Sequence, residues 1–165
     1  SQSGLTNGSK LLACLLMIVG GSPAGTAGGI KTTTVAVLLL TAISVLRGNK
    51  DTECYGRKIT FEIIRVGITI TLVTFVFWLF GVTVMTVIEP QQKVLDLMFE
   101  ATSAMATVGL TADLTPVLSD ISHVVLMLMM YIGRIGPMTM ALIFSGHVDK
   151  KNQFRTLPEA KIMVG

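Results

Sequence analysis

The sequence has little charge for its length. Only 14% of its 165 residues are Asp, Glu, Lys or Arg, whereas a globular domain usually carries about 25%. A soluble domain of this size needs a charged surface around its core, so the shortage disfavours an ordinary cytosolic enzyme. Cys14 lies in an apolar run and Cys54 in a polar loop, and the chain has no other cysteine. Two such cysteines suggest neither a metal site nor a secreted disulfide scaffold.

Apolar residues are abundant instead. They make up 51% of the chain, and the mean hydropathy is +0.70, which excludes a disordered or collagen-like chain. Residues 66–88 contain no charged side chain. As a helix this run would be about 34 Å long, enough to cross a hydrocarbon core of roughly 30 Å. Because lipid admits only helices and closed barrels, the sequence predicts an all-α integral membrane protein.

A glycine-rich segment interrupts the first apolar stretch. Residues 11–19 and 33–46 are each too short to span a bilayer as helices, and residues 20–29 between them include five glycines. One interpretation is a kink buried against neighbouring helices. The favoured interpretation is a broken transmembrane helix whose irregular part lines an aqueous cavity, where water or protein can satisfy the backbone.

A short apolar segment at 94–106 has the length of a half-helix, and a glycine-containing strip at 107–111 follows it. A plain loop is one interpretation of the strip. The other is a re-entrant pore loop whose backbone carbonyls replace the hydration shell of an ion. Gly109 would permit the backbone angles that this arrangement needs.

The last apolar stretch, 121–145, is long enough to span and carries Arg134 near its centre. A charge at that depth is costly and suggests a function by default. Arg134 could serve as a structural ion-pair or carbonyl partner within a helical bundle. It could also place a cation beside a conduction path, and the two roles are compatible.

The distribution of basic residues predicts the topology. The 47–58 loop and the 146–165 tail each carry four Lys or Arg, whereas the opposite connections, 89–93 and 111–120, carry only Lys93. The positive-inside rule therefore places the loop and the C-terminus in the cytoplasm. We expect a multi-pass membrane protein.

A soluble alternative is a phosphate-binding loop. Residues 25–32 nearly fit the pattern G-x-x-x-x-G-K-[ST], but Ile30 replaces the second glycine. That glycine lets the backbone approach phosphate. This alternative also needs residues 11–19 to form a buried strand, and the rest of the chain is typical of a membrane protein. A membrane scaffold that transports nothing is a further alternative.

Three segments, in order along the chain, resemble the Trk/Ktr/HKT superfamily of potassium transporters. Residues 20–34 resemble its glycine-rich intramembrane loop, residues 104–111 its fourth filter, and residues 133–137 the last-helix segment whose arginine faces the loop. The resemblance covers nearly the whole chain and is strongest to the C-terminal part of a Ktr-type membrane subunit. It implies four repeats of helix, pore loop and helix around one pore.

The resemblance implies that this chain carries about one and a half repeats. One filter loop cannot make a ring of carbonyls, so the chain should not conduct alone. Residues 9–47 would form the last, broken helix of repeat three, and residues 48–57 a cytoplasmic loop. Repeat four would follow at 58–146, with helix 58–88, pore helix 94–106, filter 107–111 and helix 121–146. Residues 147–165 would form a cytoplasmic tail.

The resemblance also implies the site and the function, which is potassium uptake rather than enzymatic catalysis. Backbone carbonyls of four filter residues would bind K⁺: Thr107, Val108, Gly109 and Leu110. The gate loop would obstruct the path when closed: Gly20, Gly21, Ser22, Pro23, Gly25, Thr26, Gly28 and Gly29. Arg134 and Lys31 would act as a gate or barrier.

The implied partners are the lipid bilayer, the remaining pore repeats, a second copy in a homodimer, and a cytoplasmic nucleotide-binding regulatory ring. The basic 47–58 loop and the tail are candidate contacts for that ring. No nucleic-acid partner and no cofactor in this chain are expected. K⁺ would be the transported ion, with Na⁺ as a possible coupling ion.

Overall fold

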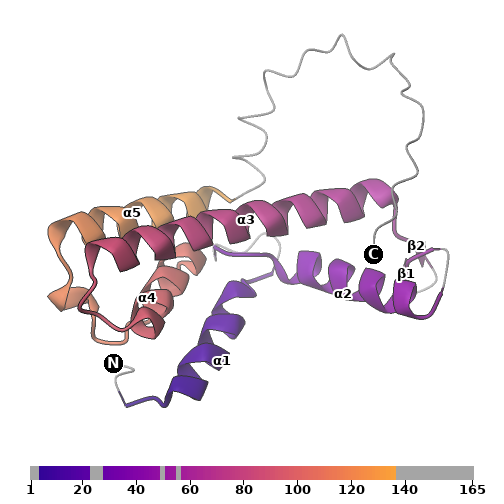
Figure 1. The fold of residues 1–165 in the computed structure, drawn as a ribbon. Helices are drawn as coiled ribbons and strands as arrows, with labels where there is room; N and C mark the ends of the chain where they lie inside the picture. The colour runs from indigo at the N-terminus through magenta and orange to yellow at the C-terminus, as the bar shows by residue number, and fades with distance from the viewer. Residues whose placement is uncertain (1–3, 23–27, 49–50, 55–56, 137–165) are drawn as a thin grey trace, which may run out of the picture.

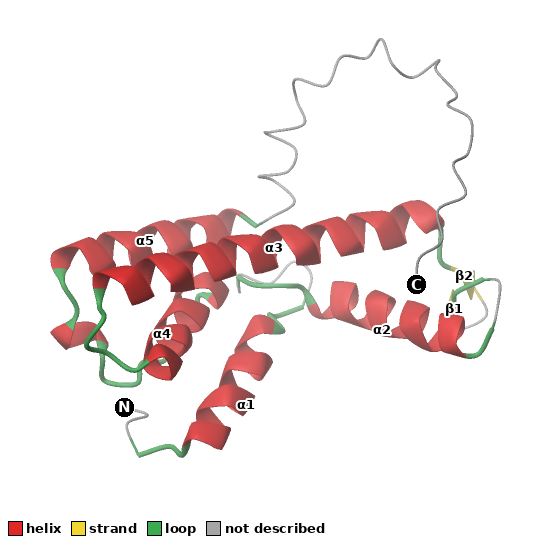
Figure 2. Cartoon of the chain, in the orientation of Figure 1, coloured by secondary structure: helices red, strands yellow, loops and turns green. Residues whose placement is uncertain are grey.

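The structure is a computed structural model that describes residues 4–22, 28–48, 51–54 and 57–136. These residues are mostly helical, as the sequence predicts, and Figure 2 shows a single small hairpin among them. The elements in chain order are α1 (Asn7–Ile18), α2 (Thr32–Leu46), β1 (Glu53–Cys54), β2 (Arg57–Lys58), α3 (Phe61–Ile88), α4 (Val94–Ala106), the 3-10 turn η1 (Thr115–Val117) and α5 (Asp120–Ile135).

Helix α3 is the longest helix, and α2, α4 and α5 pack against it (Figure 1). Among the described residues it is the one helix long and apolar enough to cross a membrane, while α1 and α2 are apolar but shorter. It begins at Phe61, not at residue 58 as predicted. The reason is that Arg57 and Lys58 pair with β1 in the hairpin, and the Ile59 amide donates to the Thr52 carbonyl at 2.8 Å.

Helix α2 runs beside one half of α3, whereas α1 points away from α3 and packs against α4 (Figure 1). Between α1 and α2 the chain ends of the break pair with each other. The Gly20 amide donates to the Ile30 carbonyl at 2.8 Å, and the Ile30 amide donates to the Ile18 carbonyl at 3.1 Å. We call these paired residues, 18–21 and 30–32, the neck. Three predicted loop residues, Pro23, Gly25 and Thr26, lie outside the described residues.

Helix α1 begins before the apolar run that predicted it. Its first residue is Asn7, because the Thr6 hydroxyl accepts from the Ser9 amide at 3.3 Å and so caps the helix. The next turn carries Lys10, which is buried and forms an ion pair with Asp96 of α4 at 2.6 Å. Asp96 lies in the first turn of α4, where the helix dipole also favours a carboxylate. This pair fixes α1 against the start of α4.

Helix α4 is the core of the molecule and packs against α1, α3 and α5. Its bounds, Val94–Ala106, coincide with those expected for the short helix, and every residue from Phe99 to Ala106 is buried. Trp78 of α3 packs against the core. Its indole N–H donates to the hydroxyl of buried Thr102 at 2.9 Å. The most buried helix is therefore one that is too short to span a bilayer.

Glu89, just after α3, joins the end of that helix to the start of α5. Its carboxylate accepts from the Ser119 amide at 2.8 Å and from the Ser122 hydroxyl at 2.9 Å. Hydrogen bonds from Ser119 and Ser122 favour the charged form and lower the pKa of the Glu89 carboxyl. The contact holds α3 and α5 together at the end where α4 also begins.

Candidate ion-permeation site

The four residues expected to bind K⁺, 107–110, begin where α4 ends, and from here on we call these four residues the strip. The backbone of the strip is left-handed at two positions. Thr107 has φ 52° and ψ 39°, and Gly109 has φ 82°. The Thr107 and Val108 amides donate back to the Ala104 and Ser103 carbonyls at 3.1 and 3.0 Å. A left-handed residue at a helix C-terminus is a common way to satisfy the last carbonyls. It is uncommon for a β-branched residue such as threonine, so the surroundings of Thr107 must hold it there.

The end of α4 makes the strip attractive to a cation. The C-terminus of a helix carries a partial negative charge, and its last carbonyls lack partners within the helix. Val108, Gly109 and Leu110 are exposed beyond this end. Their carbonyls are the ligand type with which channels coordinate K⁺.

A groove of about 730 Å³ runs along the strip, and we call it the filter groove. Three of the four predicted filter residues line it, namely Thr107, Gly109 and Leu110, and Arg134 of α5 lines it too. Val108 is exposed but is not among the lining residues. The sequence-predicted filter and the predicted barrier residue therefore share one groove.

Arg134 lies in the last turn of α5, which ends at Ile135. Gly136 has φ 84°, and its amide donates to the Ile132 carbonyl at 3.2 Å. The prediction placed Arg134 near the centre of a longer helix. Residues 137–146, over which that helix was expected to continue, lie outside the described residues, as does the tail.

The described end of the gate loop touches the first residue of the strip. The Gly28 amide donates to the Thr107 hydroxyl at 2.9 Å. A Cβ at position 28 would lie 3.0 Å from each of three oxygens: the Met105 and Gly133 carbonyls and the Thr107 hydroxyl. Glycine is needed here because the backbone approaches two other elements at once.

Helix α5 also comes close to the end of α4. A Cβ at Gly133 would overlap the Met105 carbonyl group. The gate loop at Gly28, the end of α4 at Met105 and α5 at Gly133 therefore meet at one place, which we call the junction. Arg134 follows directly in the chain. A displacement of any one of the three elements at the junction must be accommodated by the other two.

Of the remaining predicted gate residues, those that the structure describes do not line the filter groove. Gly20 lies against the Gly28 carbonyl, and the Gly21 carbonyl accepts from the Thr32 amide at 3.3 Å, so both belong to the neck. Ser22 is exposed, at the last described position before the loop. Lys31 directly precedes α2 and does not line the filter groove.

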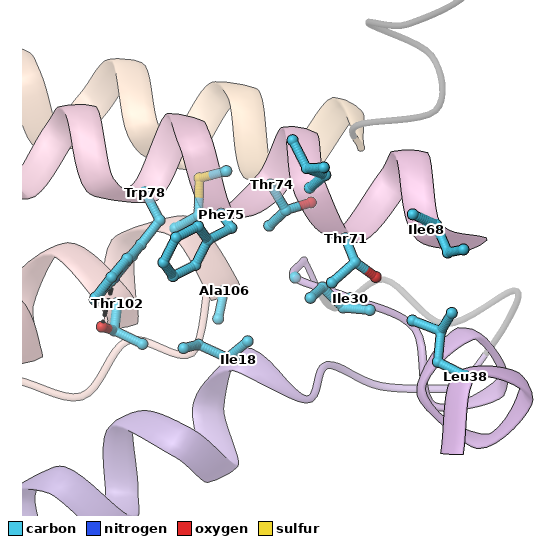
Figure 3. A pocket seen from close by; sticks show the side chains of 13 residues that line it. Ile18, Ile30, Leu38, Ile68, Thr71, Thr74, Phe75, Trp78, Thr102 and Ala106 are labelled. Carbon is cyan, nitrogen blue, oxygen red and sulfur yellow. Dashed lines mark hydrogen bonds between the residues drawn. The ribbon is translucent and has the colours of Figure 1, made fainter. Parts of the chain in front are cut away.

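Gly29, with φ 76°, lines an apolar cavity of about 450 Å³ beside the neck. Figure 3 shows that Phe75 and Trp78 of α3 line this cavity together with Ile18 and Ile30 of the neck. The last turn of α4 borders both spaces, since Met105 and Ala106 line the cavity while Ser103 and Ala104 line the filter groove.

Glu100 is a site residue that sequence reasoning did not single out. It is only 4% exposed and sits on α4 at the wall of the filter groove. Its Oε1 accepts from the Thr111 hydroxyl at 2.5 Å and from the Ala112 amide at 3.0 Å, and its Oε2 accepts from the Thr115 hydroxyl at 2.9 Å. The available signal was an acidic residue inside a short apolar segment, which in a membrane protein suggests a function.

The phosphate-loop alternative is wrong. It required a buried strand before the glycines, but that segment is the helix α1. A phosphate loop connects a strand to a helix, so that the backbone amides of the turn can surround the phosphate. Here the glycines connect two helices.

Comparison with known proteins identifies the family. The family model for TrkH, described as a cation transport protein, matches residues 1–155. The chain belongs to this family. It is 35% identical to the Ktr system potassium uptake protein B of Bacillus subtilis and 34% identical to the potassium/sodium uptake protein NtpJ of Enterococcus hirae. Each match covers 98% of this chain, but only 35% and 36% of those proteins.

A third relative, the Ktr system potassium uptake protein D of Bacillus subtilis, is 31% identical over 99% of this chain and 36% of its own length. The chain thus spans about a third of the length of the relatives it matches. The predicted resemblance to Trk/Ktr transporters is confirmed, and so is its consequence that this is a membrane transporter family and not an enzyme family.

Proposed function

We propose that the complete TrkH-family protein takes up K⁺ across a bacterial plasma membrane, and that the filter groove is part of the ion path. The observation that carries this proposal is the left-handed strip at the C-terminal end of α4. There the helix end and exposed backbone carbonyls favour a cation. The names of three relatives support the choice of ion: two are potassium uptake proteins and the third is a potassium/sodium uptake protein.

In this proposal the chain supplies one quarter of the filter and one broken helix of a four-repeat pore. Other parts of the complete protein supply the remaining filter strips. The protein crosses the membrane several times, and the hairpin loop and the C-terminal tail face the cytoplasm. A homodimer, a nucleotide-binding regulatory ring and coupling to Na⁺ belong to the same proposal.

We further propose that the glycine-rich loop is the gate. The Gly28–Thr107 hydrogen bond keeps the described end of the loop beneath the strip, against the junction. Arg134 adds a positive charge to the same groove, which opposes the passage of cations while the loop is in place.

The test of the transport proposal uses the complete protein. Expressed in a bacterial strain that lacks its own potassium uptake systems, it should restore growth at low potassium. Uptake of rubidium, a tracer for potassium, should saturate with concentration. The matched control is the same protein with Gly133→Val, which would place a side chain inside the Met105 carbonyl group and block assembly of the junction. If the intact protein reaches the membrane without restoring growth, a scaffold that transports nothing becomes the better explanation.

Replacing Thr107 by valine tests the contact between gate and filter. Valine keeps the β-branched shape and the backbone carbonyl but removes the hydroxyl that accepts from Gly28. A hydrogen bond of this kind contributes about 1 kcal/mol, so we expect uptake to rise about fivefold as the closed gate is destabilised. Tracer uptake in cells measures the effect.

Two control variants belong with Thr107→Val. Thr107→Ser retains a hydroxyl and should keep wild-type uptake. Thr83→Val removes an exposed hydroxyl on α3 that donates only to the Leu79 carbonyl of its own helix, and it should be neutral. Equal uptake by Thr107→Val and the wild type, at equal amounts of protein, would contradict the gate contact.

A further inference from the structure

Glu100 links α4 to the segment of chain that leaves the filter strip. All three of its hydrogen-bond donors lie within residues 111–115, just after the strip. We propose that Glu100 is a positioning residue for ion selection, which sets the shape of residues 107–110 without binding the ion itself. This inference rests on the proposed transport function.

The chemistry of the site explains why a carboxylate is needed. An ionised carboxylate only accepts hydrogen bonds, through two oxygens, and burying one is costly unless donors surround it. Here Thr111, Ala112 and Thr115 supply those donors. The Thr111 hydroxyl also accepts from the Asp113 amide at 3.0 Å, and Asp113 has φ 65°. The carboxylate therefore fixes a tight turn directly after the strip.

The strip is consequently held at both ends by the same helix. At its start, the Thr107 and Val108 amides donate to carbonyls of the last turn of α4. After its end, Thr111 and Ala112 donate to Glu100, one turn earlier on α4. Between these two anchors Gly109 lies in open space, since nothing lies within 4 Å of a Cβ position there. The spacing of the two anchors sets the curvature of the strip.

A direct electrostatic role for Glu100 is the competing explanation. Both of its oxygens already accept hydrogen bonds from the turn, and the side chain is buried. Two substitutions separate the explanations. Glu100→Asp keeps the charge but shortens the side chain, so it cannot reach all three donors. Glu100→Gln loses the charge but keeps the length and an acceptor oxygen.

The experiment measures K⁺ uptake by the complete protein in cells and its inhibition by Na⁺. If Glu100 acts by position, Glu100→Asp should lower the preference for K⁺ over Na⁺ about tenfold, the size of one charge-assisted hydrogen bond. Glu100→Gln should lower it less. The reverse order, with Gln the worse of the two, would overturn the inference in favour of a direct charge effect. Glu62→Gln, at an exposed position on α3, is the charge-matched control and should keep the wild-type ratio.

A third variant keeps the inference testable if both Glu100 variants fail to fold. Thr115→Val removes the donor to Oε2 and the 3.1 Å contact between the Thr115 and Thr111 hydroxyls, both within the turn that Glu100 holds. Thr83→Val is its matched control. A lower K⁺-to-Na⁺ preference in Thr115→Val alone supports the positioning role, whereas an unchanged preference overturns it. A wild-type protein with no preference for K⁺ would overturn the proposed function together with this inference. A selective wild type beside an equally selective Glu100→Asp would overturn the inference alone.

Discussion

Gly109→Ser in the complete protein is expected to lower the preference for K⁺ over Na⁺ about tenfold. Gly109 has φ 82°, and a residue with a Cβ pays about 1–2 kcal/mol for a left-handed backbone, which corresponds to a factor of roughly 5–30. The space around Gly109 is open, so the side chain itself fits and the change acts on the backbone. Competition between rubidium and sodium uptake measures the ratio.

The matched control for this variant is Gly48→Ser. Gly48, after the end of α2, has φ 71° and equally open surroundings, but it lies away from the filter groove. The backbone cost is therefore the same, and the K⁺-to-Na⁺ ratio should not change. If Gly109→Ser also kept the wild-type ratio in protein that reaches the membrane, residues 107–110 would not be the filter.

Removing residues 23–27 is expected to raise K⁺ uptake about tenfold, because a shortened loop would no longer obstruct the groove beneath the strip. The neck makes this deletion practical. Gly20 already lies against the Gly28 carbonyl, and the hydrogen bonds between Ile18, Gly20 and Ile30 hold the two ends together. A shorter connection should therefore close without displacing α1 or α2. Tracer uptake by equal amounts of protein measures the change.

The shortened loop and Gly109→Ser should change different measured quantities. The shortened loop should change the rate of uptake and leave the K⁺-to-Na⁺ ratio at its wild-type value, while Gly109→Ser should change the ratio. Normal expression of the shortened protein with unchanged or slower uptake would argue against a gate in this loop. A changed ratio would mean that the loop shapes the strip rather than closing the path.

Local sequence patterns were sufficient to locate the helices. A charge-free run predicted α3, and the short apolar segment at 94–106 has the same bounds as α4. The errors lie at the ends. Helix α1 begins at Asn7, directly after its polar cap Thr6 and before the apolar run. Helix α3 begins three residues later than predicted because the hairpin takes up Arg57 and Lys58. Caps and hairpins depend on a few hydrogen bonds, which hydrophobic periodicity does not report.

The contacts that organise the site could not be predicted in the same way. Lys10 and Asp96 are 86 residues apart in sequence, and Gly28 and Thr107 are 79 apart. No local pattern links such pairs. Glu100 has donors only 11–15 residues away, but they become neighbours because the strip turns back along α4. Residue types predicted where an ion path could lie. The junction could not be predicted from them, because it depends on how three elements pack together.

The distribution of partners around α4 has a consequence for biosynthesis. The two carboxylates of α4, Asp96 and Glu100, have partners that are synthesised at different times. Lys10, which pairs with Asp96, is made long before α4. The donors to Glu100 are made after α4. Until Thr115 has left the ribosome, burial of α4 in a bilayer would leave a charge without donors. In the proposed pore, the order of translation would therefore favour entry of α4 into the membrane only after residues 111–115 have been made.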